Sequence, residues 1–165
     1  MRATRESPSV SSSVCPRPRV LDLRLMPLRE PLPSQSAWRI TDADDAVLIA
    51  RSLVGERANE HLVAIYLSPG GCINAVSERF TSGSTVGVIV EPTAIIRGAI
   101  LANAIGLVTA HSHPGSPRPS CEDHQFWRLL AQYAEAVGIE SIDDVVIGPD
   151  EYYTRSLDQI RRYRR

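Results

Sequence analysis

Hydrophobic and polar positions follow two different periods along this chain, and together they predict alternating helices and strands from residue 38 onward. Helical spacing marks residues 46–53, the stretch that follows Pro92, and residues 121–137. In the last of these we expect a buried stripe of Phe126, Leu129, Leu130, Tyr133 and Val137. Runs rich in β-branched residues predict strands at residues 61–67, 72–80, 85–90, 107–111, 142–147 and 151–154. Because helices and strands interleave, the pattern indicates an α/β fold.

The two ends of the chain lack this periodicity. Residues 1–36 hold six of the 12 prolines, three consecutive serines and several arginines, which predicts a disordered tail. Met26 is an alternative start, in which case the residues before it are not translated. Residues 156–165 end in four arginines around Tyr163, and we expect a basic, solvated C-terminal tail. Contact with phosphate backbones stays open as an alternative for this weak basic cluster.

Composition narrows the class of protein. The formal net charge of −1 does not favour nucleic acid or an acidic membrane surface as a partner. The three cysteines are scattered and form no C-x-x-C pair, which favours a reducing compartment over a disulfide framework. No apolar run approaches the roughly 20 residues that a membrane-spanning helix needs. We therefore expect a cytoplasmic protein without a membrane partner and with one folded domain at residues 37–155.

The clearest candidate for a functional site is His111-Ser-His113, at the end of an apolar run. Residues two apart in a strand point to the same side, so the two imidazole rings are expected to face one point. A Pro-Gly pair then ends the strand, and Ser120 is expected to be the N-cap of a helix with Asp123 in its first turn. This turn brings the Asp123 carboxylate back over the histidines. Two imidazoles and a carboxylate are three protein ligands, the number that a catalytic zinc keeps when water occupies its fourth position.

The pattern His111-x-His113-Pro followed by Ser120-x-x-Asp123 resembles the metal motif of the JAMM metalloproteases, also called MPN+ or JAB. Residues 38–153 are most similar to the RadC branch of that superfamily. The resemblance implies a three-layer α-β-α MPN domain of the cytidine-deaminase-like type, with a mixed sheet.

The same resemblance implies a role for each residue of the motif. His111, His113 and Asp123 would be ligands of a Zn²⁺ cofactor, and Ser120 would help to hold the oxyanion. Glu78 lies where RadC proteins carry the glutamate that acts as general base. The local pattern by itself favours a solvated glutamate paired with an arginine at this position.

Four features differ from the RadC pattern. Nine residues separate His113 from Asp123, one fewer than is usual in the family. Asp144 occupies a position where RadC proteins usually have a histidine, and Glu91 occupies one where they often have a histidine. The helix-hairpin-helix-like segment that precedes the domain in full-length RadC proteins is not visible in this sequence.

These residues predict a zinc-dependent metallohydrolase, a JAMM-type peptidase or isopeptidase that uses zinc-activated water to cleave an amide bond. The expected substrate is a peptide or a ubiquitin-like protein. Two alternatives belong to other classes: a DNA-repair-associated RadC-like accessory protein and a catalytically silent MPN scaffold. The near-neutral charge disfavours the first, and the retention of all three ligands disfavours the second, which the shortened loop keeps open.

Overall fold

A computed structural model describes residues 39–54, 61–80 and 91–163 of the chain. The elements in chain order are α1 (Ala43–Val54), β1 (His61–Leu67), a short 3-10 helix (Pro69–Gly71), β2 (Ile73–Phe80), α2 (Pro92–Leu101), β3 (Gly106–Ser112), α3 (Cys121–Ala136), β4 (Glu140–Ile147), β5 (Glu151–Thr154) and β6 (Gln159–Arg162). The predicted tail at residues 1–36 and the predicted strand at residues 85–90 lie outside the described residues.

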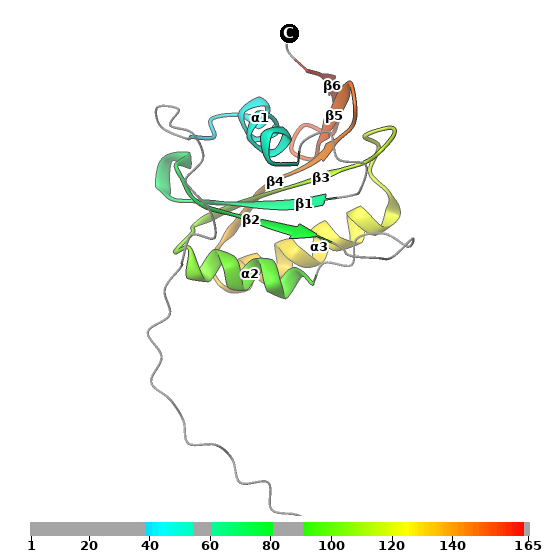
Figure 1. The fold of residues 1–165 in the computed structure, drawn as a ribbon. Coiled ribbons are helices and arrows are strands. Elements are labelled where there is room, and N and C mark those ends of the chain that lie inside the picture. The colour runs from blue at the N-terminus through cyan, green and yellow to red at the C-terminus, as the bar shows by residue number, and fades with distance from the viewer. Residues whose placement is uncertain (1–38, 55–60, 81–90, 164–165) are drawn as a thin grey trace, which may run out of the picture.

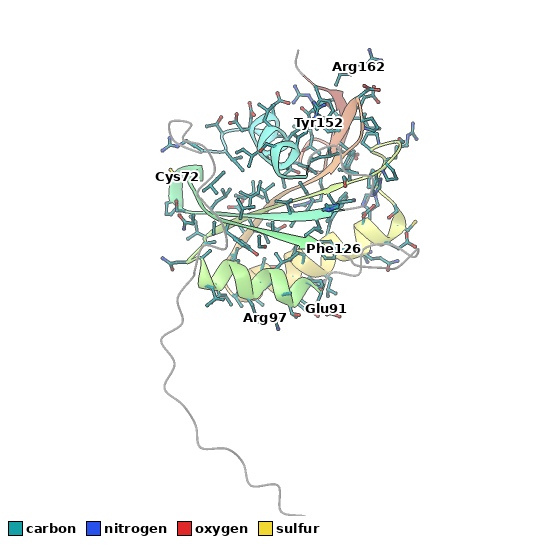
Figure 2. All side chains as sticks on the ribbon, viewed as in Figure 1. Cys72, Glu91, Arg97, Phe126, Tyr152 and Arg162 are labelled. Atoms are coloured by element: carbon teal, nitrogen blue, oxygen red, sulfur yellow. The ribbon has the colours of Figure 1, made fainter. Side chains whose placement is uncertain are left out.

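The strands form one mixed sheet between two layers of helices. Its strand order is β2-β1-β3-β4-β5-β6, and β3 and β4 run parallel whereas the other neighbours are antiparallel. Helix α1 lies on one face of the sheet, and α2 and α3 lie on the opposite face (Figure 1). Tyr152 lies on the side of α1 and Phe126 on the side of α3 (Figure 2). The predicted α/β class and its three-layer architecture are confirmed.

The central strands are apolar because both of their faces are covered. Nearly every residue of β1 and β3 is buried, as expected for strands with helices on both sides. Alternate residues of β1 enter different clusters, with Val63 and Ile65 packing toward α1 and Leu62 and Ala64 packing toward α2 and α3. Within the described residues no helix is long and apolar enough to cross a membrane.

Helix α3 buries a stripe that only partly matches the one that the sequence predicts. Trp127, Leu130 and Ala134 are its buried residues, at spacings of three and four. Three residues of the predicted stripe are instead exposed, with fractions of 37% for Leu129, 38% for Tyr133 and 47% for Val137. Leu130 is buried as predicted and Phe126 packs partly buried against the core, but the prediction was wrong for Leu129, Tyr133 and Val137. The helix carries two overlapping apolar stripes, and only packing against the sheet selects between them.

Residues 159–162, which the sequence assigned to the basic tail, form the edge strand β6. The strand pairs antiparallel with β5 after a short turn at residues 155–158. Its residues are mostly exposed and show no apolar alternation, so the periodicity that marks the other strands is missing. The pairing depends instead on the turn, where Tyr153 donates a hydrogen bond to Asp158 over 2.9 Å.

A buried polar network fastens this turn to β4. Asp144 accepts hydrogen bonds from the Thr109 hydroxyl and from Nε of Arg155, the latter over 2.7 Å. Asp143 accepts from Ser156, through the backbone N–H at 2.9 Å and through the hydroxyl at 2.8 Å. Burial raises the pKa of Asp144, and the hydrogen bonds from Thr109 and Arg155 and the charge of Arg155 act in the opposite direction. Arg155 therefore supports the ionised form of a carboxyl group that burial disfavours.

Replacing Arg155 by alanine is expected to destabilise the fold by about 2 kcal/mol at pH 7, the scale of a hydrogen bond to a charged group. The loss is expected to be smaller near pH 4. Asp144 has a raised pKa in the folded state, so its contribution to stability falls as pH rises. Removing Arg155 would raise this pKa further, and the resulting destabilisation would be present at pH 7 but largely absent where the carboxyl group is protonated. Urea unfolding at the two pH values measures the difference. Arg162→Ala, which removes an exposed pair with Glu151, is the control and should change stability little at either pH.

Candidate metal centre

The end of β3 is held by hydrogen bonds to strands on both sides. His111 is in register with Leu62 on β1 and with Val146 on the parallel strand β4. One residue beyond the strand, the backbone N–H of His113 donates to the carbonyl oxygen of Ile147 over 2.8 Å. These contacts fix the backbone of both histidines at the carboxyl end of β3.

A capping box at the start of α3 fixes the acidic residue. The Ser120 hydroxyl oxygen accepts a hydrogen bond from the Asp123 backbone N–H over 3.1 Å, and Oδ2 of Asp123 accepts one from the Ser120 backbone N–H over 2.7 Å. The predicted N-cap at Ser120 is confirmed. The nine-residue loop after His113 still brings Asp123 to the two histidines, since the donor atoms of the three residues lie within 4.8 Å of one another. The capping box then fixes the Asp123 side chain relative to Ser120.

The three side chains meet at spacings that fit a metal ion. The Nε2 atoms of His111 and His113 lie 3.1 Å apart. Asp123 reaches both rings, with Oδ1 at 3.1 Å from Nε2 of His111 and Oδ2 at 3.5 Å from Nε2 of His113. Ligands about 2.0–2.1 Å from a tetrahedral zinc are about 3.3 Å apart. The donor set of two nitrogens and one oxygen therefore fits a zinc ion in both chemistry and spacing.

A backbone carbonyl orients the second histidine. Nδ1 of His113 lies 3.3 Å from the carbonyl oxygen of Ser116. A carbonyl only accepts hydrogen bonds, so this contact requires the hydrogen on Nδ1 and leaves the lone pair of Nε2 for a metal. No sequence pattern indicated this contact, because Ser116 lies in an irregular Pro-rich loop.

Aromatic rings enclose the first histidine. His111 is buried, and its ring centroid lies 6.3 Å from that of Trp127, which stacks on Tyr153 at 6.0 Å. His124, the residue after Asp123, is exposed as predicted and lies edge-on to Trp127 at 5.2 Å. His111 is thus confined on the α3 face of the sheet, which limits the rotamers that its ring can adopt.

The Asp123 carboxylate is held in its ionised form. Burial by itself raises the pKa of Asp123, but its contacts with the His111 and His113 rings, the charge of His111 and the hydrogen bond from the Ser120 backbone N–H together lower it well below its usual range. The positive end of the α3 dipole acts in the same direction. The site therefore presents an anionic oxygen beside two imidazole nitrogens.

Glu78 is the one predicted site residue whose side chain lies outside the described part of the structure. Its backbone lies in β2, in register with Val63. Val63 in turn pairs with Ala110, the residue before His111. Glu78 thus lies two strands from the histidines, and its role as general base stays a prediction.

Gly148 lets the loop of residues 114–119, which joins His113 to the N-cap of α3 and is called the metal-binding loop for its candidate role, pack against the β4–β5 turn. A Cβ atom at this position would lie 3.0 Å from the carbonyl oxygens of both Gly115 and Glu151 and 3.1 Å from Cδ of Pro117. Contacts this short require the backbone to move. The sequence alone did not single out Gly148, because the close approach arises between residues that are more than 30 positions apart.

Replacing Gly148 by alanine is expected to weaken zinc binding by roughly tenfold, the lower end of the effects of residues that position metal ligands. The new methyl group would displace Gly115 and Pro117 and shift His113 with them. Competition with a fluorescent zinc chelator measures the change. Gly115→Ala is the matched control in the same loop, because a Cβ at Gly115 would meet nothing within 4 Å. Equal zinc affinity in both variants would show that the loop tolerates the displacement.

The three-layer fold and the His-His-Asp group at the end of β3 are those of a JAB-type domain. A family model described as RadC-like JAB domain matches residues 40–160, and the chain belongs to that family.

Several bacterial proteins are similar to this chain. A UPF0758 protein of Streptococcus agalactiae is 33% identical over 104 residues, which cover 61% of this chain and 45% of that protein. A UPF0758 protein of Burkholderia cenocepacia is 33% identical over 105 residues, covering 63% of this chain and 40% of its own length. A UPF0758 protein of a Geobacillus species is 37% identical over 98 residues, which cover 58% of this chain and 42% of that protein. The chain thus spans less than half the length of these curated relatives.

Proposed function

We propose that this chain is a zinc-dependent hydrolase that cleaves an amide bond, either in a peptide or in an isopeptide link to a ubiquitin-like protein. The observation that carries the proposal is the group of His111, His113 and Asp123, whose donor spacings fit a tetrahedral zinc ion. Membership in the RadC-like JAB family supports the same type of domain.

The residues around the group have distinct roles in the proposed reaction. A zinc ion bound there would lower the pKa of a water molecule to about 7 and polarise the amide carbonyl. His111 and His113 would each offer a ring-nitrogen lone pair to the ion, and Asp123 would supply the negative charge. Glu78 takes a proton from the attacking water and delivers it to the leaving amine, which completes the proton balance of hydrolysis.

Ser120 stabilises the oxyanion of the tetrahedral intermediate. Its hydroxyl lies 2.7 Å from Oδ2 of Asp123 and has one hydrogen to donate. Donation to the oxyanion therefore replaces the hydrogen bond to Asp123, while the hydroxyl oxygen still accepts from the Asp123 backbone N–H. This exchange lets one serine cap the helix and serve the reaction.

Zinc-dependent cleavage of mixed substrates tests the proposal. The zinc-loaded chain is incubated in ¹⁸O-labelled water with a peptide library and, separately, with a ubiquitin-like protein joined to a lysine side chain. Mass spectrometry is expected to find new carboxyl termini that carry the label, and a chelator should abolish them until zinc is restored. No cleavage in either substrate set, or cleavage that ignores the chelator, would rule the proposal out.

A further inference from the structure

A groove of about 800 Å³ adjoins the candidate metal centre. The volume lies within the range of about 300–1,000 Å³ that ligand-binding sites occupy. Its walls come from α1, the metal-binding loop, the β4–β5 turn and the end of the chain, through Arg51, Ser116, Pro117, Asp150, Glu151 and Tyr163. Ser116 links groove and metal centre, because its carbonyl oxygen is the one that lies 3.3 Å from Nδ1 of His113. The groove lies on the α1 side of the loop of residues 114–119 and the metal centre on its α3 side, so a substrate chain would reach the groove from the metal centre by passing this loop.

Tyr163 forms a rigid platform in the groove. Its hydroxyl donates a hydrogen bond to the carbonyl oxygen of Gly148 over 2.7 Å, and its ring lies against that of Tyr152 at 5.6 Å. The guanidinium carbon of Arg51 lies 4.0 Å from the centre of the Tyr163 ring. The ring is thus held from two sides and in turn holds Arg51 in place.

The donors of Arg51 remain available to a ligand. Among the residues that the structure describes, the Arg51 side chain forms no ion pair and no hydrogen bond. The guanidinium carries five N–H donors in a fork that matches the two oxygens of a carboxylate, and its contact with the Tyr163 ring uses none of them as hydrogen-bond donors to an acceptor atom. Stacking also removes much of the side-chain freedom that a ligand would otherwise have to restrict.

The other charges limit what the groove accepts. Arg162, at the outer edge of the sheet (Figure 2), is paired with Glu151 at 3.3 Å, so these two charges offset each other. Arg51, Asp150 and Tyr163 all line the groove. Burial raises the pKa of Tyr163, the charge of Arg51 opposes this shift and that of Asp150 adds to it. A densely acidic chain would therefore be repelled by Asp150, whereas one carboxylate beside Arg51 is tolerated.

We propose, on the basis of the proposed hydrolase function, that this groove binds the substrate segment on one side of the scissile amide and that Arg51 binds a single carboxylate of that segment. The carboxylate comes from an acidic side chain or from a C-terminus. Arg51 then determines specificity without touching the reacting atoms.

Peptide binding measured without hydrolysis tests this inference on the full chain. The probes are N-acetylated tetra-alanine as the C-terminal amide, the same peptide as the free acid, and an amidated version with one glutamate. Titrations followed by NMR at the Ser116 backbone amide and the Arg51 side chain are expected to show binding roughly tenfold tighter for a carboxylate-bearing peptide than for the neutral amide. The peptide that gains affinity identifies the source of the carboxylate.

Variants assign the effect to one residue. Arg51→Gln is expected to remove the preference for the carboxylate, and Arg51→Lys to reduce it, because lysine lacks the planar fork. Arg97→Gln, on the outer face of α2 (Figure 2), is the matched control and should bind as the parent does. Zinc content is measured in every variant and is expected to equal that of the parent.

Four outcomes would overturn the inference. The neutral amide could bind as tightly as the acids, or inorganic phosphate could compete as well as the peptides do, which would mark a general anion site. The Arg51→Gln variant could keep the preference for the carboxylate, or it could lose zinc. The proposed hydrolase function is tested separately. Peptide binding that depends on Arg51 in a chain that cleaves nothing would overturn the hydrolase alone, and cleavage without dependence on Arg51 would overturn the groove alone.

Discussion

Replacing His113 or Asp123 by alanine is expected to remove zinc from the chain. Elemental analysis of the parent should find close to one zinc per chain, and either variant should hold almost none after dialysis. Each of these side chains supplies one of three donors within 4.8 Å of one another, so the loss of one leaves two protein ligands, fewer than zinc sites in proteins use. The expected loss of affinity exceeds the roughly 10- to 100-fold effects of residues that only position ligands.

His124→Ala is the control for this experiment. His124 is adjacent to Asp123 in sequence, is exposed and contacts Trp127 rather than the donor group. Zinc content in this variant should equal that of the parent. If the folded parent holds no zinc, the shortened loop has impaired the site and the interpretation as a catalytically silent scaffold gains support.

Replacing Glu78 by glutamine is expected to lower kcat by roughly 10²- to 10⁴-fold, the range that a general acid–base contributes. Zinc content should not change, because glutamine removes the proton-accepting carboxylate without touching His111, His113 or Asp123. Single-turnover hydrolysis of whichever substrate the library screen identifies measures the rate. The remaining activity should be nearly independent of pH where the parent titrates its base.

Glu91→Gln is the matched control for Glu78, because Glu91 is an exposed glutamate at the N-cap of α2 whose side chain makes no capping hydrogen bond. It should retain parental activity. A Glu78→Gln variant that keeps full activity would show that another group accepts the proton. One that loses zinc as well would indicate that Glu78 is a ligand or supports the fold.

The metal centre was accessible from sequence because its parts are local. His111 and His113 are two positions apart on one strand, and a strand places such residues on the same side whatever surrounds it. Ser120 and Asp123 are linked by a capping box, which depends on the first turn of one helix. The missing loop residue left this geometry intact because each half of the site is set by its own element.

The spacing of apolar residues also predicted most helices and strands near their observed bounds, because this spacing is set by the geometry of the helix or strand itself and not by the elements that pack against it. Helix α3 is the instructive exception. Its pattern revealed a helix but not which of two overlapping apolar stripes is buried, since Trp127 turns inward only against β4 and β5 and Ala134 only within the cluster that includes α2. The strand β6 had no signal at all, since an exposed edge strand needs no apolar alternation.

The sequence by itself therefore determined the α/β class, the three candidate metal ligands and the helix cap that holds one of them, because each depends on residues a few positions apart. Only the tertiary structure decided the spacing of the donors, the approach of Gly148 to the metal-binding loop and the groove that Arg51 and Tyr163 share. The groove joins residues that are far apart in the sequence, as Arg51 and Tyr163 are, and Gly148 meets a loop more than 30 positions before it. Their proximity follows from the order in which the sheet brings its strands together, which no local pattern encodes.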